Sequence, residues 1–406
     1  MWRTQATHKR AESEYLDAAL ERLGKERALT SRADATLRAA ASSEPLLADA
    51  LRTPQSPPNH CEGPFVRDHM RIMLTVLYAV VEERLHLIDI EEFCRLKGYE
   101  GEIEELEETL KEHAAFFEVF ALCHDAAKWS AISFESAPGS RGAALGFQSP
   151  RMAAWDDVGI SERAKMRERY LELYDAFSSE RANEPGPDQQ TSFFDAYGIR
   201  IHYTGHDRLI HSPAYRALLY RLCAAHRLSD QERNLLEDVI AHHLEPIYDF
   251  SEPRAARMER YYEIARQRAY DSDDFIDLLQ AGLFLDEVCA SQRRSLHGLW
   301  HDSSILVNFL RAEFDFAPME RAKKAREREQ ERTRLQQRMF REAQLDGIAL
   351  MELIGMDPGP RFGQLLRAIH AGVLGEGELP AFPPRIKNEL QRRIDRFYAL
   401  AFPQGV

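Results

Sequence analysis

The stretch FEVFALCHDAAKWSAISF, residues 117–134, is an apolar run typical of a buried helix, yet it is interrupted by His124, Asp125 and Lys128. His124 and Asp125 are adjacent, and Lys128 follows His124 by four residues, on the same face of a helix. An adjacent imidazole and carboxylate are either satisfied within a hydrophobic core or are ligands of one metal ion. The rest of the sequence has to decide between these alternatives.

The composition is that of a globular protein. The chain has 406 residues, enough for two or three domains, and 44% of them are hydrophobic. No apolar stretch approaches the roughly 20 residues that cross a bilayer, and the first residues lack the apolar centre of a signal peptide. The 5 cysteines form no CxxC pair, which argues against a disulfide framework and a thiolate zinc site. We therefore expect a cytoplasmic protein without a membrane partner.

Helical spacing of apolar residues runs through most of the chain, and no run of alternating strands is present. The sequence therefore predicts an all-α fold. The segment 136–200 interrupts the helices with Gly, Pro and Ser and is predicted to be an insertion. The expected parts are an N-terminal helical arm (1–58), a main domain (59–316, insertion included), and a basic helix with a small helical domain (317–406).

Histidines and acids recur inside or at the ends of the apolar helices. In chain order they are His69, His124-Asp125, His206, His242-His243 and Asp286. Any one buried histidine is more often a satisfied core residue than a ligand. Adjacent helical residues reach one ion only near a helix end, so further ligands must come from separate helices. Imidazole with carboxylate suits Mn, Fe, Zn, Ni or Mg, and the series predicts a site for a divalent metal.

Four phrases carry a family resemblance: DHMRIMLTVLYAV, LCHDAAKW, GHDRLIHSPAYRALLYRLCAAHRLSDQERNLLEDVIAHHL and LLQAGLFLDEVCAS. Over about 64–300 the chain resembles the HD-domain superfamily of metal-dependent phosphohydrolases. The resemblance implies an HD-type helical bundle and a first metal held by His69, His124, Asp125 and Asp286. In members with two metals, histidines at the positions of His206 and of His242 or His243 are also metal ligands.

Two departures from the family pattern bear on these assignments. The family usually closes with an Ala-Asp pair, whereas Ala281 is followed by Gly282 here, so the choice of Asp286 needs a shifted alignment. Asp277 is the alternative to Asp286 as the last metal ligand. Either His242 or His243 can face inward, and we favour His242.

The chemistry implied by the family needs no nucleophilic side chain. A divalent cation lowers the pKa of bound water and withdraws charge from a phosphoryl oxygen. Asp125 would position the nucleophile, while Lys128, Arg67 or His206 would offset the developing negative charge. The sequence contains no GxSxG, GxxxxGK[ST] or HExxH motif that would favour another reaction.

The tail LDGIALMELIGMDPGPRFGQLLRAIHAGVLGEGEL (345–379) predicts a helix, a Pro-Gly-Pro turn and a second helix whose free N–H groups suit an anion. It resembles the tRNA-contacting segment of bacterial CCA-adding tRNA nucleotidyltransferases, some of which carry an HD domain before it. Their catalytic head is absent, so this chain is not expected to add CCA.

A basic segment leads into this tail, although the whole chain carries a net charge of −13. Residues 320–342 hold 9 Lys and Arg against 5 Glu, which indicates either a solvated helix or a place where an RNA backbone docks. The expected RNA contacts are Lys323, Lys324, Arg326, Arg334, Gly359, Arg361 and Gly363.

These observations leave three functions open. The first is a phosphohydrolase acting on RNA ends, tRNA-like ones included, that removes a 2′,3′-cyclic or terminal phosphate. The second is a nucleotide hydrolase of the dNTP or alarmone type. The third is a non-catalytic RNA-binding protein with a decayed HD domain, for which Gly282 is the best support.

Overall fold

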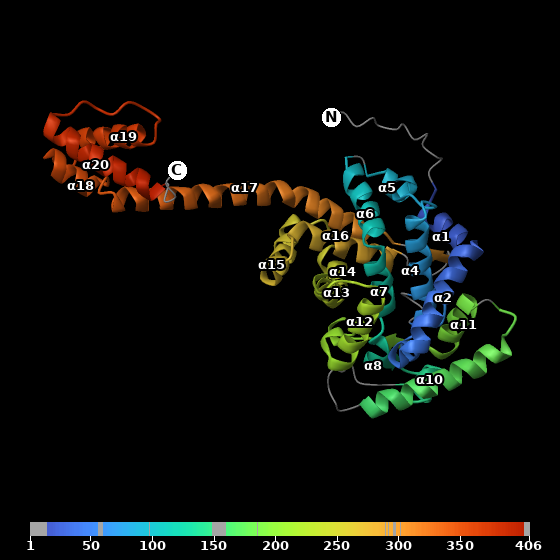
Figure 1. Cartoon of the computed structure of the whole chain (residues 1–406). Coiled ribbons are helices and arrows are strands. Elements are labelled where there is room, and N and C mark those ends of the chain that lie inside the picture. The colour runs from blue at the N-terminus through green and yellow to red at the C-terminus, as the bar shows by residue number, and fades with distance from the viewer. Residues whose placement is uncertain are drawn as a thin grey trace. The chain divides into compact units, whose positions relative to one another are not determined.

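The computed structural model describes residues 14–55, 60–96, 98–147, 160–184, 186–288, 290, 292–294, 298–300 and 302–401. It contains two compact units, Met1–Phe316 and Ala317–Val406. The described elements are mostly helices, with two short two-stranded antiparallel sheets (Figure 1). The prediction of an all-α fold is confirmed. No helix in the described ranges has both the length and the apolar character needed to cross a bilayer.

Besides α4 (Val66–Val81), the first part of the first unit contains a series of further helices. They are α1 (Leu16–Lys25), α2 (Arg27–Ser43), α3 (Pro45–Ala50), η1 (Leu87–Asp89), α5 (Glu91–Cys94), α6 (Glu100–Glu112), α7 (Ala114–Cys123) and α8 (Lys128–Ala131). Helix α4 packs against α1, α2, α6 and α7, and it is buried on nearly every side, as expected of a helix that is apolar all round. The helices of 1–58 that the structure describes share this core.

The rest of the first unit brings the chain back over the other side of α7. Its elements are η2 (Asp207–His211), α12 (Pro213–Ala225), α13 (Asp230–His242), α14 (Glu245–Asp249), η3 (Ala255–Arg257), α15 (Met258–Arg268), α16 (Ser272–Leu283), η4 (Phe284–Val288), β3 (Gln292–Arg294), β4 (Gly298–Trp300) and the start of α17 (Ser304–Glu342). Helices α12 and α13 contact α7, and α16 contacts α6 and α13.

Local signals fix where two of these helices begin. In α13 the Ser229 hydroxyl accepts a hydrogen bond from the Glu232 amide, and the Glu232 carboxylate accepts one from the Ser229 amide. In α16 the Asp271 side chain accepts bonds from the amides of Asp273 and Asp274. These caps fix the residues at which α13 and α16 begin.

The insertion forms a small substructure of its own. Strands β1 (Ser133–Ser136) and β2 (Ile199–His202) pair antiparallel at its base, and between them lie α9 (Arg141–Ala144), α10 (Ile160–Glu180) and α11 (Gly186–Tyr197). Its core is mainly aromatic: Phe134, Phe147, Tyr170, Tyr174, Phe177, Phe193 and Tyr197. Because β1 and β2 pair, the chain returns beside residue 132 before it continues to His206. Helix α10 lies at the lower edge of the unit in Figure 1.

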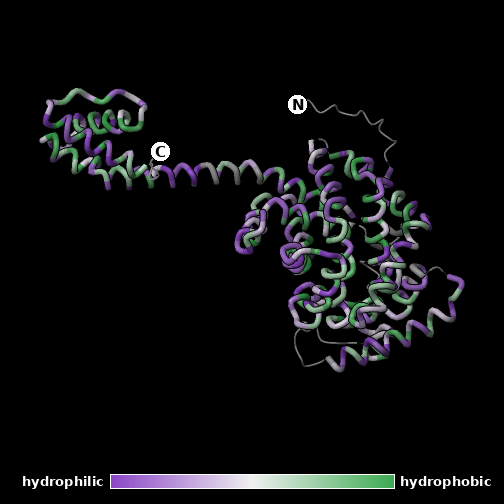
Figure 2. The backbone as a smooth tube through the Cα atoms, in the orientation of Figure 1, coloured by the Kyte–Doolittle hydropathy of each residue, from purple (hydrophilic) through white to green (hydrophobic). Residues whose placement is uncertain are grey.

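The second unit consists of the rest of α17 with α18 (Gly347–Ile354), α19 (Pro360–Val373) and α20 (Pro384–Ala401). A separate core holds it together, formed by Phe340, Ala343, Leu345, Leu350, Phe362, Ile369, Val373, Leu390, Ile394 and Phe397. Helix α18 ends at Gly355, whose φ of +69° is the left-handed conformation that glycine adopts at helix ends. Figure 2 shows hydrophobic and hydrophilic residues interspersed along most helices, as expected where one face of each is buried.

Candidate metal centre

Buried histidine and aspartate side chains converge at the centre of the first unit. One ligand atom from each of His69, His124, Asp125 and Asp286 lies within 4.8 Å of every other. A second group with the same spacing is formed by Asp125, His206 and His243. Asp125 therefore belongs to both groups. We call these six residues the metal cluster.

The cluster residues come from separate elements. His69 lies on α4, His124 caps α7, Asp125 follows in the turn before α8, His206 precedes η2, His243 caps α13, and Asp286 lies on η4. Because α7 ends at Cys123, the adjacent His124 and Asp125 can both face the same centre.

Three imidazole rings are oriented by backbone carbonyl groups. The Nδ1 atoms of His124, His206 and His243 lie 3.2, 2.8 and 2.5 Å from the carbonyl oxygens of Phe120, Tyr203 and Ile240. A ring whose Nδ1–H donates to a carbonyl turns the lone pair of its Nε2 atom the other way, which is the usual arrangement of histidine ligands.

Several of the atoms that face the centre lack hydrogen bonds, although His69 Nε2 lies within hydrogen-bond distance of Asp286 Oδ1, at 3.1 Å. His124 Nε2 lies 3.4 Å from Asp125 Oδ2 and 3.5 Å from Asp286 Oδ1, and His206 Nε2 lies 3.2 Å from Asp125 Oδ1. Within the described residues, His124 Nε2, His206 Nε2 and Asp125 Oδ1 are nevertheless buried without a hydrogen-bond partner. Such atoms are rare in folded proteins. Imidazole nitrogens and carboxylate oxygens aimed at one point fit a divalent metal.

A short π-helical segment places Asp286 in the cluster. The segment is η4, and irregular helical turns of this kind often occur at functional sites. Just before it, a Cβ atom on Gly282 would lie 3.2 Å from the ring of Phe120, which itself stacks on His124 with 5.1 Å between ring centroids. Gly282 therefore allows α16 to approach the ring that supports His124.

Asp277, the alternative to Asp286, lies elsewhere on α16. Burial and the nearby carboxylates of Glu313 and Glu105 raise the pKa of Asp277 to about 8. It is not part of the described groups that can hold a metal ion.

Of the adjacent histidines, the structure brings His243 to the cluster and not His242, which we favoured. Helix α13 ends at His242, whose Nδ1 lies 3.1 Å from Glu245 Oε2, outside the cluster. His243 Nε2 lies 3.7 Å from Asp286 Oδ2. Burial lowers the pKa of His243 to about 4, so its ring is neutral near pH 7, the form in which imidazole binds a metal.

Lys128 lies next to the cluster and is buried with it. Its Nζ atom is 2.6 Å from Asp125 Oδ2 and 5.2 Å from the centre of the Tyr203 ring. Burial by itself would raise the pKa of Asp125, but the charges of Lys128 and His124 outweigh it and hold the pKa well below its ordinary value. Asp125 is therefore a carboxylate at every physiological pH.

Glu62 is a site residue that the sequence did not indicate. Its Oε1 atom lies 3.1 Å from Nδ1 of His69 and 3.0 Å from Nδ1 of His60. Burial lowers the pKa of His69, but bonds to Asp286 and Glu62 outweigh this and raise it to about 10. A carboxylate behind a ligand histidine fixes the orientation of its ring. The only sequence signal was the phrase HCE just before α4, in a stretch rich in helix breakers.

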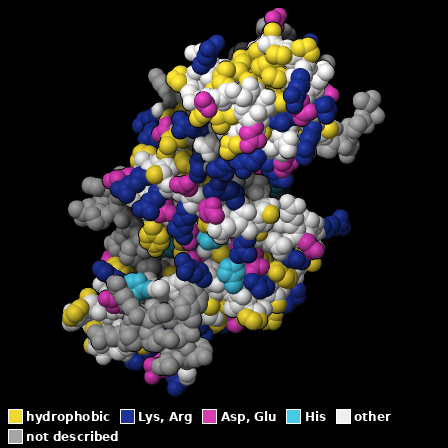
Figure 3. Space-filling model, turned by 90° about the vertical axis from the view of Figure 1, so that its left-hand side faces the viewer, with side chains coloured by type: hydrophobic (Ala, Val, Ile, Leu, Met, Phe, Trp, Pro, Cys, Tyr) yellow, Lys and Arg dark blue, Asp and Glu magenta, His cyan; other side chains and the backbone are white. Residues whose placement is uncertain are grey.

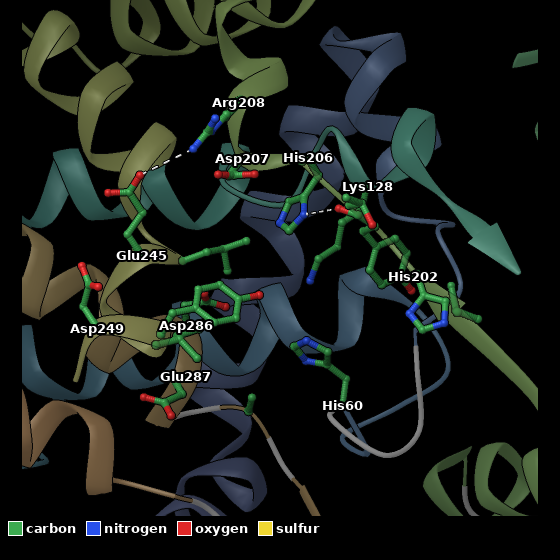
Figure 4. Close-up of a pocket in the computed structure, with 18 of the residues that line it drawn as sticks. His60, Lys128, His202, His206, Asp207, Arg208, Glu245, Asp249, Asp286 and Glu287 are labelled. Atoms are coloured by element: carbon green, nitrogen blue, oxygen red, sulfur yellow. Dashed lines mark hydrogen bonds and ion pairs between the residues drawn. The ribbon is translucent and has the colours of Figure 1, made fainter. Parts of the chain in front are cut away.

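A cavity of about 820 Å³ opens beside the cluster. Residues that line it include His60, Lys128, His206, Asp207, Arg208, Glu245, Asp249, Asp286 and Glu287, drawn in Figure 4. The Lys128 ammonium group points into this space in the close-up. On the face shown in Figure 3, histidine side chains are visible among basic and acidic ones.

The residues expected to contact RNA all belong to the second unit. Lys323, Arg326 and Arg334 lie on α17 with exposed side chains, and the side chain of Lys324 lies outside the described residues. Gly359 precedes α19, while Arg361 and Gly363 lie in its first turn. None of them takes part in the described metal groups.

The fold and the site define an all-α protein with a buried histidine and aspartate group that can hold a metal ion. Comparison with models of protein families, with curated proteins and with solved structures found no match. The description of this chain as an all-α protein with a possible metal site therefore rests on the geometry given above.

Proposed function

We propose that this protein is a metal-dependent phosphohydrolase that acts on phosphoesters at RNA ends. The observation that carries the proposal is the set of buried, unpartnered His124 Nε2, His206 Nε2 and Asp125 Oδ1 atoms beside a cavity that Lys128 also lines. The resemblance of these residues to the HD-domain ligand series supports the phosphoester as substrate.

The chain supplies the groups that such a reaction needs. A divalent ion in the cluster would supply a water of lowered pKa and withdraw charge from a phosphoryl oxygen. The Lys128 ammonium group is desolvated and reaches the cavity, so it can bind a phosphate oxygen more strongly than an exposed lysine would. Its bond to Asp125 holds both groups in place before the substrate arrives.

The RNA part of the proposal draws on the second unit. Arg326, Arg334 and Arg361 expose guanidinium groups, which bind phosphates in two-pronged geometry. The resemblance of 345–379 to a tRNA-contacting segment supports a tRNA-like 3′ end among possible RNA partners. We further propose that the protein acts in the cytoplasm.

Hydrolysis by purified protein tests this function. The protein, loaded in turn with Mn, Mg, Ni, Fe or Zn, is incubated with RNA that ends in a 2′,3′-cyclic or a terminal phosphate. We expect a product with at least one metal, and none after Asp125→Asn. His242→Ala serves as the matched control, because this histidine faces away from the cluster. No product with any metal would refute the activity on RNA ends.

A free nucleotide is a second candidate substrate. The cavity of about 820 Å³ lies within the range of pockets that bind small molecules, so a dNTP or an alarmone is of suitable size. A panel of nucleotides, assayed beside the RNA substrates, separates these possibilities. If the purified protein retains no metal and its stability is unaffected by chelators, a non-catalytic RNA-binding protein is favoured instead.

A further inference from the structure

The cavity has a region with an apolar wall. Leu244, Ile247 and Tyr248 line it, and they follow directly after the cluster residue His243. Tyr248 is 78% exposed, more than any other large hydrophobic side chain among the described residues. Aromatic side chains are common in the lining of pockets that bind small molecules.

The backbone under this ring is firmly anchored. Helix α14 has only five residues, and its ends are fixed by the buried Pro246 and Phe250. The Phe250 ring stacks on Phe309 with 4.3 Å between ring centroids, and Asn308 donates a hydrogen bond to the Phe250 carbonyl at 3.0 Å. Tyr248 therefore presents its ring from a rigid support, which lowers the entropic cost of binding a ligand.

Charges near the ring restrict the kind of ligand. Arg260 lies 2.7 Å from Glu245 and 3.5 Å from Asp249, and Arg208 lies 3.8 Å from the other oxygen of Glu245. Both guanidinium groups are thus engaged by carboxylates of the wall. Asp207 and Glu287 add further acids to the lining. This region consequently suits an uncharged planar group rather than additional phosphates.

We propose that Tyr248, with Leu244 and Ile247, forms a subsite for the nucleobase of a substrate whose single phosphate lies at Lys128 and the metal cluster. This inference rests on the proposed function, because it takes the phosphate position from it. Bases of every kind stack on aromatic rings, so the subsite selects a nucleoside without selecting its sequence. The terminal residue of an RNA and a free nucleoside monophosphate share this chemistry, whereas a nucleoside triphosphate fits it poorly.

Binding of two ligands that differ only by the base tests the subsite. AMP and ribose 5-phosphate are titrated into the full-length, Mn-loaded protein, and their dissociation constants are measured by calorimetry. We expect AMP to bind roughly 5- to 150-fold more tightly, the range given by one base stacked on an aromatic side chain. Tyr248→Ala should remove this preference, and Tyr248→Phe, which keeps the ring, should retain it.

The controls make a negative result informative. Tyr15→Ala removes another exposed tyrosine ring of the first unit and should leave the preference unchanged. Equal affinities of the wild-type protein for AMP and ribose 5-phosphate, or a preference that survives Tyr248→Ala, would overturn the subsite. An RNA oligonucleotide with a 3′-phosphate, titrated in the same way, shows whether polymer or monomer is the tighter ligand.

The two proposals can fail separately. A base preference that depends on Tyr248, together with no hydrolysis under any metal, would retain the subsite and refute the phosphohydrolase. Hydrolysis of RNA ends that depends on Asp125, with the same rate and KM after Tyr248→Ala, would refute the subsite and retain the enzyme.

Discussion

His242 and His243 are adjacent, yet only one of them faces the cluster. We expect His243→Ala to weaken Mn binding at least about tenfold, because it removes a nitrogen that faces Asp286, and His242→Ala to leave binding unchanged. Calorimetric titration of the metal-free protein with Mn measures both. Equal effects of the two substitutions would contradict the orientation of α13.

Glu62 lies beside His69 and would influence a metal in the cluster through the orientation of that ring. Its carboxylate oxygen Oε1 lies 3.1 Å from Nδ1 of the ring, so Glu62→Ala should lower metal affinity by about 10- to 100-fold. Glu62→Gln keeps an oxygen acceptor near Nδ1 of His69, so its metal affinity should fall less than that of Glu62→Ala. Metal content after dialysis against a graded chelator series gives the order of affinities. If Glu62→Ala leaves metal affinity unchanged, the ring of His69 is oriented by packing alone.

At the scale of a helix, Gly282 controls how closely α16 approaches α7. Alanine gains about 1 kcal/mol of helix propensity, but forcing its methyl group against Phe120 costs about 1–3 kcal/mol. Phe120 is fully buried and stacked on His124, so moving it would displace His124 as well, and we expect Gly282→Ala to lower the free energy of unfolding and metal affinity together.

Urea unfolding with and without Mn measures both effects of Gly282→Ala. Gly101→Ala is the matched control, since nothing lies within 4 Å of its added Cβ atom on α6. That control should stabilise the protein by up to about 1 kcal/mol. If Gly282→Ala also stabilised it, the close approach of α16 to Phe120 would carry no structural constraint.

Helix α16 also carries an acid that destabilises the fold when charged. The pKa of Asp277 is raised to about 8, whereas an unfolded aspartate has a pKa of about 4. Between these values the folded state retains a proton that the unfolded state releases, so the free energy of unfolding falls as pH rises. Asp277→Asn should remove this loss and stabilise the protein more at about pH 8 than at about pH 5. Thermal unfolding of the wild-type and Asp277→Asn proteins at both pH values measures this difference. The same stabilisation at both pH values would refute the prediction.

The helices themselves were predictable because their signals are local. Apolar spacing indicates α4 and α7, and the Ser229 and Glu232 pair marks the start of α13. The series of cluster residues was predictable too, because each histidine or aspartate interrupts an apolar run. The sequence did not predict which residue at a helix end points toward the cluster, because a one-residue shift exchanges His242 for His243. Glu62 and the π-helical turn at Asp286 depend on contacts between distant segments.

At the scale of the whole molecule, two separate cores imply two unfolding events. The metal cluster belongs entirely to the first unit, and the second unit has its own core. In calorimetry of the full chain, Mn at about 100 times its dissociation constant should stabilise only the first unit, by about 2.7 kcal/mol. The fragment 317–406 identifies the transition of the second unit. A single transition that shifts as a whole with Mn would contradict independent units.

The distribution of the cluster along the chain has a consequence for synthesis in the cell. Its residues are supplied by segments from α4 to η4, so a growing chain that has emerged only as far as α8 presents His69, His124 and Asp125 without their partners. Until Asp286 has left the ribosome, an ion has no complete coordination sphere to enter. An ion that binds the cluster would therefore be acquired only after the entire first unit has been synthesised and can fold around it.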